Sequence, residues 1–337
     1  MSRRRILMIA TGGTIASTPE GAGLAPTATG RELAEKVPLL DTLCELDFVQ
    51  PMNIDSTNMR PRDWMRMAHV IRKAYARYDG FVILHGTDTM AYTAAALSYL
   101  IQDSAKPIVL TGSQQPMASP FTDAKLNIYQ SVLYACDEES HDVSVVFGGQ
   151  VICGTRARKQ RTMSFNAFVS MNFPPLAYLR NDRIVRATDP HPEPRDQARK
   201  PRFYDDLDER VIVLKLTPEL RPSIFELLKR DYDAVIVETF GIGGIPAYDR
   251  SYQEAIFDWV DSGRTLVITT QVPEEGLDLG IYEVGHAYAE KDGILTGDDM
   301  TTEALVAKTM WALGQTHDPA EVARLFYQPI GHDRETR

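Results

Sequence analysis

The sequence contains little cysteine, and its histidines are scattered. Among its 337 residues are three cysteines, Cys44, Cys136 and Cys153, an odd set that forms no CxxC pair. The seven histidines form neither an HExxH motif nor a close cluster with cysteine. These absences exclude a disulfide-stapled secreted domain and disfavour a metalloenzyme. We therefore expect reduced thiols, no metal and no cofactor.

Positive charge is also in deficit, and no apolar run is long. The 36 lysines and arginines against 46 acidic residues give a net charge of −10. Because a phosphate backbone requires a basic face, we expect no nucleic-acid partner. No stretch approaches the roughly 18 apolar residues of a membrane span, and the apolar run after MSRRR ends at Ala10, too early for a secretion signal. The prediction is a cytoplasmic protein without a membrane partner.

The length of the chain predicts two domains. A chain of 337 residues exceeds the usual limit for one hydrophobic core. From 187 to 209 the sequence becomes rich in proline and charge and loses its apolar periodicity, which is typical of an exposed linker. We predict an N-terminal domain at 1–188, a linker at 189–209 and a C-terminal domain at 210–337.

Short apolar runs alternate with helical periodicity on both sides of this linker. Continuous apolar runs are typical of parallel strands buried on both faces. The pattern predicts an α/β protein with two doubly wound domains, a larger one with a parallel sheet and a smaller, flavodoxin-like C-terminal one. The expected strands are 6–10, 81–85, 107–112, 143–149, 211–216, 234–240 and 265–271, and the expected helices are 61–78, 89–101, 122–136, 222–230, 251–262, 301–315 and 319–327.

Polar clusters follow three of the expected strands, where open parallel sheets bind ligands. Thr14 follows a Gly-Gly pair in ATGGTIAS, Thr87 and Asp88 lie in HGTDTMAYTA, and Lys159 ends GTRARK. Hydrolysis of a carboxamide requires a nucleophile, a base and donors for the oxyanion. A threonine hydroxyl is almost wholly protonated at neutral pH, so a lysine held by a carboxylate has to accept its proton. Backbone amides around the glycines can stabilise the oxyanion.

Each cluster alone also has an ordinary structural explanation. The Gly-Gly pair can be a plain turn, and a Thr-Asp pair at a helix start is commonly a cap. Lys159 can be a solvated surface charge. The occurrence of all three at successive strand ends favours catalysis.

Two segments, IATGGTIAS (9–17) and LHGTDTMAYTA (84–94), together resemble the signatures of the bacterial-type L-asparaginase family. The resemblance extends to DSTNM (55–59), LTGSQQP (110–116), the GTRARK segment and GDDMTTEA (297–304), and it looks like the cytoplasmic, type I branch. It implies hydrolysis of L-asparagine to L-aspartate and ammonia, a weaker L-glutaminase activity and a homo-oligomer, either a dimer or a tetramer.

The resemblance also assigns roles to individual residues. It makes Thr14 the nucleophile that forms an acyl-enzyme and Thr87, Lys159 and Asp88 the second catalytic group, without settling which threonine attacks first. Asp88 also binds the α-ammonium of the substrate, and the Ser56-Thr57 pair holds its α-carboxylate. The expected substrate-binding residues are Gly13, Ser56, Thr57, Gly86, Thr87 and Asp88.

Three positions depart from the family pattern. Leu24 replaces a tyrosine in the segment 17–30, which we expect to be a lid loop, so another donor or direct lysine assistance has to act beside Thr14. Gly244 replaces an asparagine that reaches a neighbouring subunit's site, which predicts altered intersubunit contact. Val272 replaces a cysteine of a second, regulatory asparagine site, so we expect that regulation to be absent or altered.

Three alternative functions fit the sequence less well. A nucleotide-binding enzyme is disfavoured because GIGGIP (241–246) has Pro246 in place of the third glycine of GxGxxG, and no GxxxxGK[ST] occurs. The related subunit that deamidates glutamine for tRNA-dependent synthesis generally has an extra N-terminal domain, whereas the first motif here begins at residue 9. A binding-only protein with a degraded site is disfavoured by the four retained catalytic side chains. Preference for asparagine over glutamine stays open, because one methylene is worth only about 1 to 3 kcal/mol.

Overall fold

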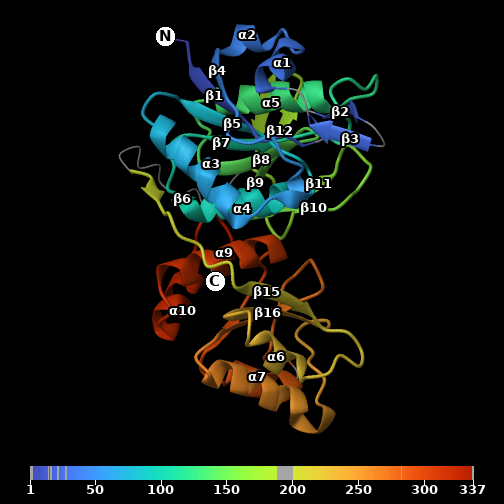
Figure 1. Ribbon diagram of the computed structural model, residues 1–337, viewed down its shortest axis with the longest axis vertical. Coiled ribbons are helices and arrows are strands. Elements are labelled where there is room, and N and C mark those ends of the chain that lie inside the picture. The colour runs from blue at the N-terminus through green and yellow to red at the C-terminus, as the bar shows by residue number, and fades with distance from the viewer. Residues whose placement is uncertain are drawn as a thin grey trace. The chain divides into compact units, whose positions relative to one another are not determined.

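The computed structural model describes residues 3–13, 15, 17–20, 23–26, 29–187, 200–281 and 283–335. The chain divides into two compact units, Met1–Asp205 and Asp206–Arg337 (Figure 1). Most of the predicted linker, residues 189–199, lies outside the described residues. The predicted domain limits therefore stay a prediction.

An eight-stranded sheet forms the centre of the N-terminal unit (Figure 1). Five strands are parallel and lie in the order β4-β1-β5-β7-β8, and an antiparallel edge β9-β12-β13 continues from β8. The predicted parallel sheet is confirmed as the main part of a mixed sheet. The bounds are β1 Arg5–Ala10, β4 Glu45–Val49, β5 Gly80–Leu84, β7 Ile108–Thr111, β8 Val143–Phe147, β9 Gln150–Cys153, β12 Ala177–Arg180 and β13 Arg183–Arg186.

The predicted strand 143–149 is too long by two residues, because a tight turn follows Phe147. Gly148 and Gly149 have φ of 57° and 80°. A two-residue hairpin turn with positive φ at both positions matches the twist of the strands it joins and favours glycine. The turn reverses the chain into β9, which starts the antiparallel edge.

The flavodoxin-like strand order occurs in the N-terminal unit, not in the C-terminal unit where it was predicted. Counted along the chain, the five parallel strands lie in the order 2-1-3-4-5, which is the flavodoxin order. The four strands of the C-terminal unit instead lie in chain order. In the N-terminal sheet the chain leaves β1 to one side, towards β4, and then crosses to its other side, towards β5. Ligands bind at such a reversal in open α/β sheets.

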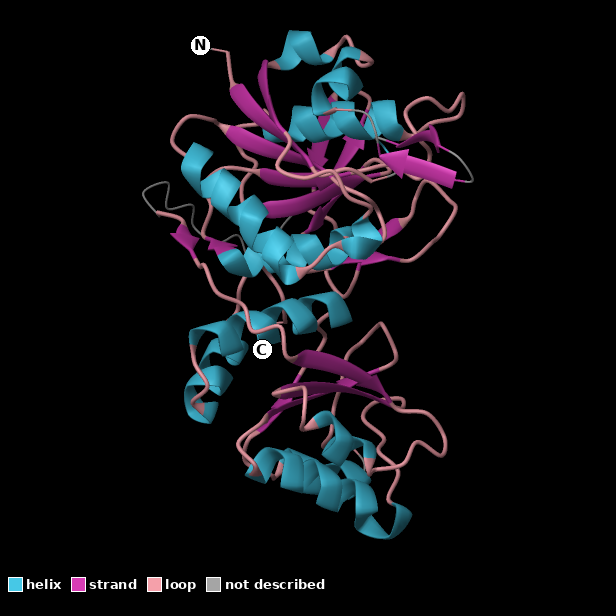
Figure 2. Ribbon diagram, in the orientation of Figure 1, coloured by secondary structure: helices cyan, strands magenta, loops and turns pink. Residues whose placement is uncertain are grey.

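Helices cover both faces of the large sheet, as Figure 2 shows. One hydrophobic core joins α1, α2 and α5 to one face, and α3 packs with α4 on the other, where Trp64 Nε1 donates to Thr93 Oγ1 at 2.9 Å. The strands β5, β7 and β8 step in one direction, yet the connecting helices α4 and α5 cover opposite faces. One of these two crossovers therefore has the rare left-handed sense. The bounds are α1 Gly30–Glu35, α2 Leu40–Leu43, α3 Pro61–Ala74, α4 Met90–Leu100 and α5 Ala124–Ala135.

The C-terminal unit is a smaller α/β domain, as predicted, with a four-stranded parallel sheet. A second hydrophobic core packs α6, α7 and α8 against this sheet, and α9 contacts β15 and β16. The short strand β18 and helix α8 were not predicted. The bounds are β15 Val211–Lys215, β16 Ala234–Thr239, β17 Thr265–Thr270, β18 Ile294–Thr296, α6 Ile224–Leu228, α7 Ser251–Asp261, α8 Glu283–Ala289, α9 Thr302–Gln315 and α10 Pro319–Tyr327.

Three short ribbons complete the described structure. The segment 17–30 was predicted to be a lid loop. Its described residues form a two-stranded antiparallel ribbon, β2 (Ser17–Glu20) with β3 (Gly23–Pro26), and the start of α1 at Gly30, so the expectation of a loop is wrong there and the role of a lid stays a prediction. The other pairs are β6 (Ile101–Gln102) with β14 (Arg202–Phe203) and β10 (Ala157–Lys159) with β11 (Phe168–Ser170). Within the described ranges, every helix is too short or too polar for a bilayer crossing. Cys44, Cys136 and Cys153 are free thiols.

Candidate active site

The segments that follow β1, β4 and β5 meet at the carboxyl edge of the large sheet, at the reversal of strand order. The amide of Gly13 donates to the carbonyl of Ile54 at 3.1 Å, which joins the segments after β1 and β4. Thr89 Oγ1 donates to the carbonyl of Ser56 at 2.8 Å, which joins the segments after β5 and β4. The strand order thus brings three sequence motifs into one place.

Two glycines allow this close approach. Gly13 has φ of 84°, and a Cβ there would overlap the backbone of Gly86. A Cβ on Gly86 would lie 2.5 Å from Ser56 Oγ. Because side chains cannot occupy this space, glycine at both positions is a steric requirement of the site.

Lys159, Thr87 and Asp88 form a connected polar group. Lys159 Nζ donates to Thr87 Oγ1 at 2.8 Å and to Asp88 Oδ1 at 2.6 Å. Thr87 is only 5% exposed, the Lys159 side chain is 18% exposed, and the Asp88 side chain is 56% exposed. The hydroxyl is therefore shielded, whereas the carboxylate faces solvent. The structure brings together three of the four residues predicted to be catalytic.

The position of Lys159 comes from a ribbon that sequence reasoning did not find. Lys159 is the last residue of β10 and pairs with Phe168 of β11. The ring of Phe168 packs on Phe147, with centroids 5.0 Å apart, which ties the ribbon to the end of β8. The apolar anchor holds the strand, so the lysine side chain can extend towards the segment after β5.

The fourth predicted catalytic residue, Thr14, lies outside the described residues. Its neighbours Gly13 and Ile15 are described, and Ile15 is buried in the core that α5 covers. The role of Thr14 stays a prediction.

Ser56 and Thr57 belong to a 3₁₀ turn, η2 (Ser56–Asn58), after β4. Ser56 is buried beside Gly86, and Thr57 is exposed. The Asp55 carboxylate accepts the amide and the hydroxyl of Thr57, each at 2.9 Å. Asp55 was not predicted as a site residue. Aspartate commonly caps the start of a turn of this kind with its side chain.

Gln114, which follows β7, was also missed. Its Oε1 accepts a hydrogen bond from Thr87 Oγ1 at 3.3 Å. The motif LTGSQQP contains this residue, and a polar side chain just after a strand of the same sheet was the signal available.

A buried hydrogen-bond chain begins at His85, two residues before Thr87. His85 is fully buried, and its Nδ1 contacts the carbonyl of Gly86 at 2.7 Å, which requires a proton on Nδ1 because a carbonyl only accepts. Its Nε2 then accepts from Thr93 Oγ1 at 3.0 Å, and Thr93 in turn accepts from Trp64. Burial lowers the pKa of His85 from 6.5 to about 4, so the ring is neutral at neutral pH.

This depressed pKa predicts a loss of stability in acid. The unfolded chain takes up the proton below pH about 6.5 and the folded chain only below about 4, so the free energy of unfolding should fall across that window. The shift corresponds to a total loss of about 3 kcal/mol. Urea titrations at several pH values in this window give the free energy of unfolding as a function of pH. This free energy should fall less steeply with decreasing pH in His85→Asn than in wild type, whereas the exposed control His286→Gln should keep the wild-type dependence on pH. Equal slopes for wild type and His85→Asn would contradict the assignment.

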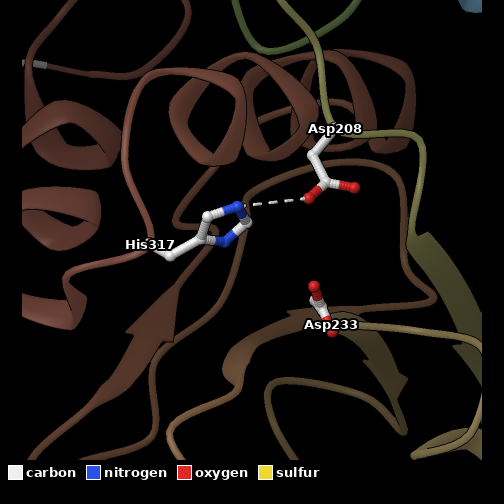
Figure 3. A group of neighbouring side chains, drawn as sticks. All are labelled: Asp208, Asp233 and His317. Atoms are coloured by element: carbon white, nitrogen blue, oxygen red, sulfur yellow. Dashed lines mark ion pairs between the residues drawn. The ribbon is translucent and has the colours of Figure 1, made fainter.

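Among the described residues, one group has the spacing of possible metal ligands, and it lies in the C-terminal unit. Asp208, Asp233 and His317 offer ligand atoms within 4.8 Å of one another (Figure 3). The Arg210 guanidinium, however, forms ion pairs with both carboxylates, and the pKa of Asp208 is lowered despite partial burial, chiefly by its hydrogen bonds with Arg210. The two acids are already paired with a cation, so we assign this group a structural role at the start of β15 and not a role in metal binding or catalysis.

Comparison with known proteins gives matches over both units. The family model described as Asparaginase, N-terminal, matches residues 5–191, and the Glutaminase/Asparaginase C-terminal domain matches residues 210–326. The solved structure of the thermostable L-asparaginase from Thermococcus kodakarensis superposes with a TM-score of 0.91 at 34% identity, covering 99% of this chain and all of that one.

Three curated relatives are similar over almost the whole chain. The L-asparaginase of Thermococcus kodakarensis is 34% identical, over 97% of this chain and 98% of its own length. A glutamyl-tRNA(Gln) amidotransferase subunit of Pyrococcus horikoshii is 33% identical, over 95% of this chain and 74% of its own length. L-asparaginase 1 of Escherichia coli K12 is 31% identical, over 98% of each chain. The prediction from the motifs is confirmed: the chain belongs to the asparaginase family of amidohydrolases, with both of the family's domains.

Proposed function

We propose that this protein hydrolyses L-asparagine to L-aspartate and ammonia, with a weaker activity on L-glutamine. The observation that carries the proposal is the position of Lys159, whose ammonium contacts both Thr87 Oγ1 and the Asp88 carboxylate. A hydroxyl, an amine and a carboxylate in contact, beside glycine backbone amides, form a set able to perform amide hydrolysis.

In the proposed mechanism Thr14 attacks the side-chain amide carbon and forms an acyl-enzyme. The proton of its hydroxyl has to leave as the bond forms and has to reach the departing ammonia. Thr87 and Lys159 supply the route for this proton, because Lys159 in its neutral form accepts a proton and in its charged form returns one. Water then hydrolyses the ester with the same group as base. The burial of Thr87 keeps bulk water from competing for its hydrogen bonds.

The substrate is an amino-acid zwitterion, and the proposed site offers an anchor for each of its charges. Asp88 presents a half-exposed carboxylate for the α-ammonium. The buried Ser56 lies beside Gly86, where its hydroxyl can donate to the α-carboxylate. Thr57 is proposed to bind the same carboxylate. Its amide and its hydroxyl both donate to Asp55 here, so one of these two bonds has to open when the substrate binds.

The alternative is a glutamine-deamidating subunit that serves tRNA-dependent synthesis, since an amidotransferase relative shares about a third of its aligned residues with this chain. The net charge of −10 offers little attraction for a tRNA backbone. As the resemblance implies, we further propose that the protein acts in the cytoplasm as a homo-oligomer.

Ammonia release from free asparagine and free glutamine tests the proposal. Wild type should turn over asparagine faster than glutamine, and Thr14→Ala and Thr87→Ala should each lower kcat at least about a thousandfold, because each removes a group needed in the transition state. The exposed control Thr42→Ala, which changes the same residue type on α2, should keep wild-type rates. Wild-type activity in both site variants would overturn the mechanism. Turnover of glutamine alone would favour the alternative.

A further inference from the structure

We propose that Gln114 is a positioning residue that sets the direction of the Thr87 hydroxyl proton. The inference rests on the proposed function, in which Thr87 and Lys159 transfer protons. Gln114 follows β7, the sheet neighbour of β5, so its side chain meets Thr87 across the carboxyl edge of the sheet. Thr87 Oγ1 has two contacts there, Lys159 Nζ at 2.8 Å and Gln114 Oε1 at 3.3 Å.

The orientation of the Gln114 amide follows from its other partners. Its Nε2 faces two backbone carbonyls, that of Ser164 at 3.3 Å and that of Arg161 at 3.5 Å. An amide NH₂ donates and a carbonyl only accepts, so the opposite orientation would place three acceptor oxygens together. Oε1 must therefore face Thr87, and the Thr87 hydroxyl must donate to it.

The backbone that carries Gln114 is itself held in place. The Asp123 carboxylate accepts the amide of Gln114 at 3.0 Å and that of Gln115 at 3.1 Å. Asn127 Nδ2 donates to Asp123 and to the carbonyl of Gly112, each at 3.0 Å. Both supporting side chains are buried. A side-chain amide carried by a rigidly held backbone can impose a direction on the Thr87 hydroxyl, whereas a mobile side chain could not.

This arrangement has a chemical consequence for Lys159. With the Thr87 proton directed to Gln114, Lys159 meets a lone pair of Oγ1 and not the proton, so the observed contact is one in which a Lys159 N–H donates to Oγ1. The Thr87 hydroxyl must turn its proton away from Gln114 before neutral Lys159 can accept that proton. Gln114 also joins Thr87 to the segment after β10 that follows Lys159, through Ser164 and Arg161. Loss of the amide should therefore lower kcat more than it raises KM.

Two substitutions of Gln114 by residues close to glutamine in size test the proposal. Gln114→Met removes both hydrogen bonds, and we expect kcat for asparagine to fall about tenfold with KM changed less than about threefold. Gln114→Glu places a carboxylate against the oxygen that Lys159 contacts. The added negative charge opposes the loss of a proton from the neighbouring amine, so the rising limb of the kcat profile should move up by about one pH unit. Gln115→Glu, the same charge change at an exposed neighbour, should leave kcat and the profile as in wild type.

A second measurement does not depend on turnover. Labelling of Lys159 with an amine-reactive reagent across pH, followed by peptide mass spectrometry, gives the midpoint at which this amine loses its proton. Gln114→Glu should raise that midpoint by about one unit, and Gln115→Glu should leave it unchanged.

The outcomes separate the inference from the proposed function. If wild type does not hydrolyse asparagine but the labelling midpoint moves in Gln114→Glu, the proposed function fails, whereas the contact of residue 114 with the Thr87-Lys159 pair is supported. If asparagine is hydrolysed and both Gln114 variants keep the wild-type kcat, pH profile and labelling midpoint, the inference is overturned. A fall in kcat in Gln114→Met accompanied by an equal fall in the amount of folded protein, with no midpoint shift in Gln114→Glu, would also overturn it.

Discussion

Lys159→Met should lower kcat for asparagine at least about a thousandfold while the protein remains folded. Methionine has a similar length and no amine, so it removes both the donor to Thr87 and the ion pair with Asp88. Removal of a positioned acid or base costs up to about 10⁴-fold. The Asp88 carboxylate is half exposed, so the loss of its partner should cost little stability. Steady-state ammonia release and a urea titration measure the two effects separately.

Lys159→Arg distinguishes a proton acceptor from a fixed positive charge. Arginine keeps the charge and stays protonated, so it cannot accept a proton from Thr87. We expect this variant to be nearly as inactive as Lys159→Met. Recovery of most of the wild-type kcat in Lys159→Arg would show that the site needs only a cation and would refute the proposed base. Lys125→Met, at an exposed lysine of α5, is the control for a general effect of charge removal and should keep wild-type kcat.

Gly13→Ala should destabilise the N-terminal unit by about 4 kcal/mol and abolish most of the activity. Two costs combine at this position, since alanine at a φ of 84° is strained and its Cβ would overlap the backbone of Gly86. Backbone cannot move away as the end of a flexible side chain can. The separation of the Gly13 and Gly86 segments would displace Thr87 from the position in which Lys159 reaches it, and misplacement by about 1 Å can cost about a hundredfold in rate.

Gly263→Ala is the matched control for Gly13→Ala. Gly263 has a similar φ of 80°, but a Cβ there meets no atom within 4 Å. It should therefore show only the conformational cost, about 1 kcal/mol, with activity unchanged. Urea midpoints and ammonia release for both variants provide the comparison. Equal destabilisation by the two substitutions would show that the contact with Gly86 does not limit the approach of the two segments.

The predicted secondary structure was correct wherever apolar residues recur with a clear period. The helix from Pro61 to Ala74 buries Trp64, Met67 and Ile71 on one side, and the continuous runs at β1, β5 and β8 are buried along nearly their whole length. Such patterns depend on each segment's own geometry. The misses are short elements of two to seven residues, such as β10, β18 and α8, in which too few residues are present to show a clear period.

By itself the sequence determined the α/β class, the two-domain chain and the residue types of the site. Motifs at strand ends and the family resemblance were enough to expect Thr87, Asp88 and Lys159 in one place, and their side chains are in contact. Only the tertiary structure decided which strands are neighbours, and hence that the flavodoxin order lies in the N-terminal unit and that Gln114 faces Thr87. The physical reason is range: periodicity records contacts within a few residues, whereas Thr87 meets Gln114 and Lys159 only because sheet pairing brings segments 27 and 72 residues apart into contact.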